Sequence, residues 1–204
     1  MSLVLGITGG IATGKTTVME MFRDIGAQTL SADEVAREVL APGTQAAEKV
    51  VERFGPSILA PDGSIDRKAL GEIVFRDPKA REELNAITHP LIIARLEERI
   101  QEFRERAGEG EVLAVEIPLL VECNLARLVD KVVVVAAEQE TQVRRLTTRS
   151  MSLDQARQRV AAQVPIKDKL PLADWVVWTD GTLEDTRQQV ARIWEEAGKH
   201  QGRT

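Results

Sequence analysis

The residues whose spacing points most directly to a chemistry form a glycine-rich stretch near the start of the chain. Residues 9–16 read Gly9-Gly10-Ile11-Ala12-Thr13-Gly14-Lys15-Thr16, the pattern G-x-x-x-x-G-K-[ST], and they follow directly on the apolar run Leu3–Thr8. A strand that enters such a loop and continues into a helix directs backbone N–H groups toward a phosphate chain. The sequence therefore predicts a P-loop that binds the phosphates of a nucleotide.

The positions of this loop have distinct expected roles. The glycines let the backbone approach the phosphates closely, Lys15 places a positive charge beside the β- and γ-phosphates, and the Thr16 hydroxyl is a ligand for Mg²⁺. The helix that begins near Lys15 adds the partial positive charge of its N-terminus. We therefore expect nucleotide contacts from Gly9, Gly10, Ala12, Thr13, Gly14, Lys15, Thr16 and Thr17.

Asp33 is the leading candidate for a catalytic base. It follows the short apolar segment Thr29–Leu30, at what would be the carboxyl end of a strand. Open α/β sheets gather their ligands at this edge. The stretch Ser31-x-x-Glu34 also has the pattern of a helix capping box, in which Asp33 would be a favourable first-turn acid. The two roles are compatible, because a cap would direct Asp33 toward the same edge of the sheet.

Glu116 is the candidate for holding the metal. It ends the apolar run Val112–Val115 as the acid of a Walker B strand does, and a carboxylate there can hold Mg²⁺ through water. Buried strands often end in an acid, so this position alone leaves a purely structural role equally open.

The elements that must position these residues alternate along the chain. Apolar runs rich in β-branched residues predict short strands, and because they are apolar throughout they are typical of parallel strands buried on both faces. Helical patterns separate them, which predicts an α/β fold with a doubly wound parallel sheet. The predicted strands are five: Leu3–Thr8, Thr29–Leu30, Val112–Ile117, Lys131–Ala136 and Trp175–Trp178, with helices over 16–25, 34–40, 139–149, 154–163 and 183–197.

The segment Gln45–Arg106 is too long for a single crossover between strands. It contains a turn at Pro61–Ser64, and its prolines predict one helix that starts after Asp77-Pro78 and another that starts around Thr88-His89-Pro90. We interpret it as a helical insertion at the ligand-binding end of the sheet, where a second substrate would lie.

Composition excludes several classes of protein. The 204 residues are 43% hydrophobic and 29% charged, as in an ordinary globular domain. No apolar run reaches the roughly 20 residues of a membrane span, and Met1 leads directly into the first predicted strand, so we expect neither a membrane partner nor a signal peptide. The net charge of −5 argues against a general nucleic-acid surface. The single cysteine, Cys123, fits a cytoplasmic location, and with two histidines a histidine metal site is not expected.

Basic residues concentrate in one segment of this acidic chain. Between Arg144 and Lys169 lie seven lysines and arginines against only Asp154 and Asp168. A local anionic ligand would explain this distribution, and a solvated helix face is the alternative.

A P-loop indicates a nucleotide but not a reaction. The chain contains neither the D-x-x-G nor the N-K-x-D pattern of a GTPase, and it is shorter than most motor or transporter ATPases. A small phosphotransferase fits best. Such an enzyme needs an acid near the acceptor hydroxyl, an acid near the metal and cations around the transferred phosphoryl group.

The motifs together resemble the dephospho-coenzyme A kinase family over about residues 3–197. The P-loop is shared by many families, whereas the T-H-P and P-L-L-x-E motifs in this order are highly specific. The segments that carry the resemblance are Thr8–Thr17, Ala32–Arg37, Phe54-Gly55, Asp62–Arg67, Leu70, Ile73–Phe75, Ile87–Ile92, Ile117–Glu122, Gln142–Leu146, Arg149, Gln163, Lys169 and Ala173-Asp174.

The resemblance implies a P-loop kinase fold and a two-substrate reaction. The enzyme would use ATP and Mg²⁺ to phosphorylate the ribose 3′-hydroxyl of dephospho-coenzyme A, the final step of coenzyme A biosynthesis. Asp33 would be the base, with Lys15, Arg145 and Arg149 as catalytic cations and Thr16 and Glu116 on the metal. The residues along the acceptor pocket would be Asp33, Arg37, His89, Pro118, Leu119, Leu120 and Glu122.

The resemblance also implies a division of the chain. A core would comprise about residues 1–36, 111–137 and 170–200, with the acceptor-binding insertion at about 37–110 and a helical lid at about 138–169. Three positions depart from the family pattern. Ser31 replaces the first aspartate of D-A-D, Glu116 stands where aspartate is common, and Asp180 replaces the asparagine that commonly precedes the glycine after the last strand, so adenine contacts there are not carried over.

Two other functions stay open at this point. One is a kinase for a nucleoside or nucleoside monophosphate, which an acceptor panel would distinguish. The other is a regulatory nucleotide-binding module without catalysis, against which the intact Lys15, Thr16 and Asp33 argue. The sequence does not fix the oligomeric state.

Overall fold

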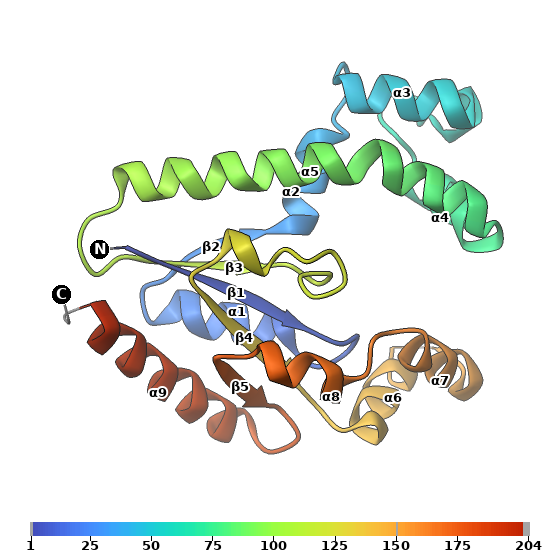
Figure 1. Ribbon diagram of the computed structural model, residues 1–204. Coiled ribbons are helices and arrows are strands. Elements are labelled where there is room, and N and C mark those ends of the chain that lie inside the picture. The colour runs from blue at the N-terminus through green and yellow to red at the C-terminus, as the bar shows by residue number, and fades with distance from the viewer. Residues whose placement is uncertain (1, 150, 202–204) are drawn as a thin grey trace. The chain divides into compact units, whose positions relative to one another are not determined.

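Five parallel strands form one sheet, in the order β2-β3-β1-β4-β5, in the computed structural model, which describes residues 2–149 and 151–201 (Figure 1). The central strand β1 pairs with β3 on one side and with β4 on the other. The predicted parallel five-stranded sheet is confirmed, including the short second strand predicted at Thr29–Leu30. The strands are β1 (Leu3–Gly9), β2 (Gln28–Ser31), β3 (Val112–Glu116), β4 (Lys131–Ala136) and β5 (Trp175–Trp178).

The chain divides into two compact units. The sheet unit comprises residues 1–31 and 103–204, and the helical unit comprises Ala32–Glu102. The functional division into core, insertion and lid stays a prediction. The helices of the sheet unit are α1 (Lys15–Asp24), α6 (Gln139–Thr147), α7 (Leu153–Ala161), α8 (Ile166–Lys169) and α9 (Leu183–Gln201), with 3₁₀ turns η2 (Ala126–Leu128) and η3 (Leu170–Leu172).

Helices α1 and α9 lie side by side along one face of the sheet (Figure 1). Alternate strand residues, such as Leu5 of β1 and Val133 of β4, belong to a core that also contains Phe22 of α1 and Ile193 of α9. Successive side chains of a strand point to opposite faces, so the uninterrupted burial of β1 means that its other face is covered as well.

The opposite face of β1 is covered so closely that it requires a glycine. A Cβ atom on Gly6 would lie 2.7 Å from Leu120 Cδ1 and 2.9 Å from Val129 Cγ2. Leu120 is fully buried and belongs to the loop that follows β3. Gly6 thus lets this loop lie directly on the central strand.

The helical unit contains α2 (Ala32–Val39), α3 (Gln45–Phe54), the 3₁₀ turn η1 (Pro56–Ile58), α4 (Arg67–Arg76) and most of α5 (Pro78–Arg106). Its core centres on Val50, Ile58 and Leu70. Side-chain caps define where its helices start: the Thr44 hydroxyl accepts the N–H of Ala47, and Asp66 accepts those of Lys68 and Ala69. The predicted turn at residues 61–64 is present, with Asp62 accepting from the Ser64 hydroxyl and N–H.

The predicted second helix start at Thr88-His89-Pro90 is wrong. Helix α5 runs without a break from Pro78 to Arg106 and contains Pro90 in its interior. A proline removes one helical hydrogen bond but does not by itself end a helix. Thr88 is buried in this helix, and its hydroxyl donates to the carbonyl oxygen of Leu84 at 2.9 Å, as is common within a helix. The predicted start after Asp77 is confirmed.

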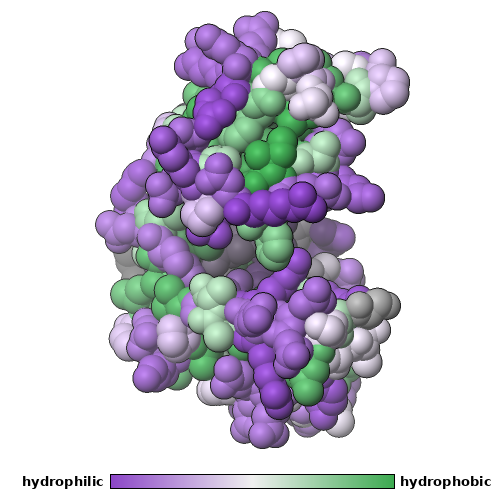
Figure 2. Space-filling model, turned by 90° about the vertical axis from the view of Figure 1, so that its right-hand side faces the viewer, coloured by the Kyte–Doolittle hydropathy of each residue, from purple (hydrophilic) through white to green (hydrophobic). Residues whose placement is uncertain are grey.

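One face of the molecule is mainly hydrophilic. On the face shown in Figure 2, polar and charged side chains cover most of the surface, with apolar side chains in smaller groups between them. Among the described residues, no helix combines the length and the apolar character that crossing a membrane requires.

The close fit at Gly6 leads to a test of the sheet unit. We expect Gly6→Ala to lower the free energy of unfolding by about 1–3 kcal/mol, because the new methyl group overlaps Leu120 and Val129. Urea denaturation measures the change. Gly198→Ala in α9 is the matched control, since a Cβ there meets nothing within 4 Å and should leave stability unchanged or slightly higher. Equal stability of both variants would contradict the packing described here.

Candidate functional site

The glycine-rich segment forms the expected loop between the end of β1 and the start of α1. Gly14 is the N-cap of α1, with a φ of 90°, and helix α1 begins at Lys15. Glycine adopts this left-handed conformation more readily than other residues, which explains the residue type at this turn. The first turn of α1 therefore carries Lys15, Thr16 and Thr17, with its N-terminus directed toward the loop.

The Lys15 ammonium group lies on the loop itself. Its Nζ donates to the carbonyl oxygens of Gly9 at 3.2 Å and Gly10 at 2.8 Å. The positive charge is thus held at the loop, where the phosphates of a nucleotide would bind.

Two glutamines hold the peptide groups of Ile11. The Gln142 Nε2 donates to the Ile11 carbonyl at 2.8 Å, and the Ile11 N–H donates to the Gln163 Oε1 at 2.6 Å. A Cβ on Gly10 would lie 2.6 Å from the Gln142 Nε2, so the close approach of this amide depends on that glycine. Gln142 is on α6 and Gln163 follows α7, so two separate parts of the predicted lid segment contact the P-loop.

Arg145 and Thr179 fix the next part of the loop. The Arg145 guanidinium donates to the Ala12 carbonyl at 3.0 Å and to both the hydroxyl and the carbonyl of Thr179. The Thr179 hydroxyl is buried and donates to the Thr13 carbonyl at 2.7 Å. Arg145 is therefore an anchor between α6, the end of β5 and the P-loop, which the sequence did not indicate.

A cavity of about 300 Å³ lies beside this anchor. It combines two cations with small and hydroxylated residues, a setting that suits the base and ribose of a nucleotide. Arg149, which is exposed, contributes the second cation. The lining residues are Ala12, Gly14, Thr17, Arg145, Arg149, Thr179, Gly181, Thr182, Leu183 and Thr186.

A second cavity, of about 490 Å³, also borders the loop, at Gly10. Its walls are mainly apolar and come from the end of β4, α6, β5 and the segment that joins α7 to α8. They include Gln142 and Gln163, so the two glutamines that hold Ile11 also face this space.

The loop after β3, residues 117–125, is fixed at three points. The Thr8 hydroxyl donates to the Pro118 carbonyl at 3.2 Å, Leu120 is buried over Gly6, and the Lys169 Nζ donates to Glu122 Oε1 at 2.7 Å. Between these points Leu119 is 44% exposed. Burial, with a smaller effect of the Glu122 charge, raises the pKa of the neighbouring Cys123 thiol, so this thiol is neutral near pH 7.

Thr16 and Glu116 suit a magnesium ion that is held mostly by phosphate oxygens and water. Thr16 is exposed in the first turn of α1, and Glu116 ends β3 opposite Ile7 of β1. Among the side chains that the structure describes, no cluster of three or more His, Cys, Asp or Glu could hold a metal by itself. A hydroxyl and a carboxylate, completed by phosphate and water, are the donors that Mg²⁺ takes in kinase sites.

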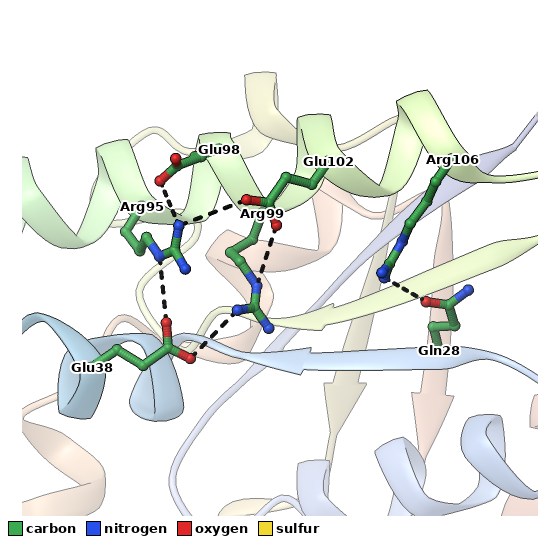
Figure 3. A network of polar contacts seen from close by, with 7 residues as sticks. All are labelled: Gln28, Glu38, Arg95, Glu98, Arg99, Glu102 and Arg106. Atoms are coloured by element: carbon green, nitrogen blue, oxygen red, sulfur yellow. Dashed lines mark hydrogen bonds and ion pairs between the residues drawn. The ribbon is translucent and has the colours of Figure 1, made fainter.

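The remaining predicted residues lie in the helical unit. Asp33 and Arg37 are both exposed and stand four residues apart on α2, so they share one face of this helix. Glu38, the next residue, lies between two arginines of α5, at 3.4 Å from Arg95 and 3.7 Å from Arg99 (Figure 3). These contacts hold α2 against α5.

His89 is also on α5, and it is partly exposed. Figure 3 shows that the same two arginines contact Glu98 and Glu102 of their own helix. Nearer the end of α5, within the sheet unit, Arg106 donates to Gln28 of β2 at 3.0 Å.

Comparison with known proteins identifies the family. A sequence model of the family described as dephospho-CoA kinase matches residues 3–185. The chain belongs to the dephospho-CoA kinase family. The dephospho-CoA kinase of Geobacter metallireducens is 45% identical over 195 residues, which cover 95% of this chain and 96% of that protein.

Solved structures agree. The dephospho-CoA kinase from Campylobacter jejuni is 32% identical with a TM-score of 0.75, covering 98% of this chain and 99% of that one. A protein from Thermus thermophilus is 32% identical with a TM-score of 0.76, and the match covers 96% of this chain and 97% of that one. The fold is that of the P-loop kinases, and the family consists of transferases that phosphorylate an alcohol group in the final step of coenzyme A biosynthesis.

The sheet unit brings the predicted nucleotide-binding residues of the P-loop together with Arg145 and Arg149. It separately anchors Pro118–Glu122. The roles of these residues, and of Asp33, Arg37 and His89 in the helical unit, stay predictions. Sequence reasoning missed Thr179 altogether, and it gave no role to Gln142, Gln163 or Lys169, although the family motifs contain the last three.

The Thr179 anchor leads to a test of nucleotide binding. We expect Thr179→Val to weaken ATP binding about tenfold, because Arg145 and the Thr13 carbonyl each lose a buried partner while the side-chain volume is kept. Thr179→Ser, which keeps the hydroxyl, should bind within about threefold of the parent. Isothermal titration with ATP measures both affinities, and tight binding by the valine variant would contradict the anchoring role.

Proposed function

We propose that this chain transfers the γ-phosphoryl group of ATP to the ribose 3′-hydroxyl of dephospho-CoA, with Mg²⁺, through the residues described above. The observation that carries this assignment is the P-loop of a dephospho-CoA kinase family member, held by side chains of α6 next to a cavity of nucleotide size. A cytoplasmic location, expected from the single cysteine, stays a prediction.

The donor half of the proposed site is in the sheet unit. The phosphates would lie on the P-loop, from Gly9 to Thr17, with the base and ribose in the cavity of about 300 Å³. Lys15 and the N-terminus of α1 would attract the phosphates. Arg149 would face the phosphoryl group, and Arg145 would both hold the loop and add positive charge.

Thr16 and Glu116 would hold the magnesium ion. A bound Mg²⁺ supplies charge neutralisation on the phosphate oxygens of the donor. The Thr16 hydroxyl would be a direct ligand, and the Glu116 carboxylate would bind through water. Both residues keep the donor in one orientation relative to the P-loop.

The acceptor half would use the residues that the family motifs imply for it. Leu119 is the exposed apolar residue of the loop after β3, and the buried Leu120 packs the same loop against Gly6. Pro118 and Glu122 belong to the same loop, and Arg37 and His89 would add contacts from α2 and α5. Asp33 would accept the proton of the 3′-hydroxyl as the oxygen attacks phosphorus.

An acceptor panel tests the function. We expect the protein to convert ATP and dephospho-CoA into ADP and CoA, which chromatography of the products measures directly. Nucleosides, nucleoside monophosphates and water should be poor acceptors at the same concentration. Preferential phosphorylation of a nucleoside or a nucleotide other than dephospho-CoA would overturn the assignment.

The base assignment has its own test. We expect Asp33→Asn to lower kcat by about 10²–10⁴-fold, since the amide cannot accept the hydroxyl proton. The neighbouring exposed acid provides the control: Glu34→Gln should keep kcat within about threefold, because glutamine also serves in a capping box. Steady-state rates of CoA formation give both values, and an Asp33→Asn variant as active as Glu34→Gln would show that another group is the base.

A further inference from the structure

Lys169 is the most deeply buried of the charged side chains that the structure describes, and the proposed reaction leaves it without a role. Its side chain is 1% exposed, and its Nζ lies 2.7 Å from Glu122 Oε1, whose side chain is 22% exposed. Forty-seven positions separate the two residues in the chain. The contact therefore joins α8, at the end of the predicted lid segment, to the loop after β3.

A buried ion pair of this kind is weak evidence for a role in stability. Removing two charges from water is costly, and an apolar pair of similar size is often as stable or more stable. An ion pair does, however, fix the relative position of the two segments that carry it, because the ammonium group and the carboxylate must meet within hydrogen-bond distance.

The loop 117–125 depends on the pair at one of its ends. Near its start, the loop is held by the Thr8 hydroxyl on the Pro118 carbonyl, and in its middle by Leu120 over Gly6. Local hydrogen bonds, such as Cys123 N–H to the Leu119 carbonyl at 2.9 Å, curl the rest into turns. Beyond Leu120, the contact of Glu122 with Lys169 is a long-range side-chain tether that holds this loop before the buried Leu125.

We propose that Lys169 is a positioning residue for the acceptor: its ion pair with Glu122 holds residues 117–125 in the conformation that presents Leu119 to dephospho-CoA. This inference rests on the proposed function, and it assigns Glu122 a role different from direct contact with the substrate. The Glu122 carboxylate directs the loop, and the acceptor contacts the loop rather than this carboxylate. The end of the lid segment and the acceptor loop then share one tether.

Two variants separate positioning from direct contact. Lys169→Met leaves Glu122 without its partner, and we expect it to raise the KM for dephospho-CoA about tenfold, with the KM for ATP within about twofold. The double variant Lys169→Met with Glu122→Leu replaces the ion pair by apolar packing. We expect it to restore the KM for dephospho-CoA to within about threefold of the parent.

The chain offers a matched control for the loss of a lysine. Lys131 lies 2.7 Å from Asp174, the same distance as in the Lys169 pair, and joins the start of β4 to the residue before β5. We expect Lys131→Met to leave both KM values unchanged. If Glu122 bound the substrate directly, the double variant would remain as impaired as Lys169→Met or become worse, and the proposal would be overturned.

Hydrogen exchange provides a readout that does not depend on turnover. In the ligand-free protein, mass spectrometry of peptides that cover residues 117–125 should show faster amide exchange in Lys169→Met, and parent-like exchange in Lys131→Met and in the double variant. Unchanged exchange in Lys169→Met overturns the tether. If the parent does not phosphorylate dephospho-CoA, the proposed function fails, and the exchange data still decide whether Lys169 holds the loop.

Discussion

The backbone carbonyls of the P-loop need hydrogen-bond donors that a regular strand or helix would otherwise supply. From Gly9 to Gly14 every backbone carbonyl accepts a hydrogen bond from such a donor. Lys15 donates to the first two, Gln142 to that of Ile11, Arg145 to that of Ala12, Thr179 to that of Thr13, and the N–H of Val18 to that of Gly14. The donors come from three places: helix α1, helix α6 and the residue that follows β5. The shape of the loop is therefore a property of the whole sheet unit and not of the glycine-rich sequence alone.

This arrangement also determines what the loop can bind. With the carbonyls directed toward protein donors, the loop does not present a row of negative oxygens to a phosphate. The same contacts hold α6 against the P-loop, so that α6 would form a wall of the proposed nucleotide site. If α6 left the P-loop, the carbonyls of Ile11 and Ala12 would each lose a donor, at about 1–3 kcal/mol for each one buried without a substitute. Arg149 follows the end of α6 and is not one of the donors to these carbonyls. It is therefore better suited than Arg145 to approach a phosphoryl group.

The sequence predicted the features that depend on neighbouring residues. The strands Lys131–Ala136 and Trp175–Trp178 were placed to the residue, because buried parallel strands are apolar throughout. The helix start at Lys15 followed from the loop pattern. The interruption expected at Pro90 was wrong, because a proline weakens a helix by a local amount that the packing of a long helix can exceed.

Contacts between distant residues could not be predicted in this way. Gln142 and Gln163 lie 131 and 152 positions from Ile11, and nothing in a glutamine indicates which peptide group it will bind. Lys169 reads as part of a basic, solvated segment, and only its 1% exposure shows otherwise. Thr179 gives no signal at all, since a threonine after a strand is ordinary. The candidate site was thus predictable in its motifs and not in the contacts that hold them.

The orientation of helix α2, which carries Asp33, depends on the contacts of Glu38. Helix α2 spans only Ala32–Val39, and an isolated helix of this length is not stable in water. Its direction is set by packing and by Glu38, which contacts both Arg95 and Arg99. Each exposed pair alone is worth little. The two arginines lie one turn apart along the long helix α5. Because the Glu38 carboxylate contacts both of them, the pair of contacts favours one rotation of α2 about its own axis. Asp33 and Arg37 share a face of that helix, so the Glu38 contacts turn the proposed base and its neighbouring cation together.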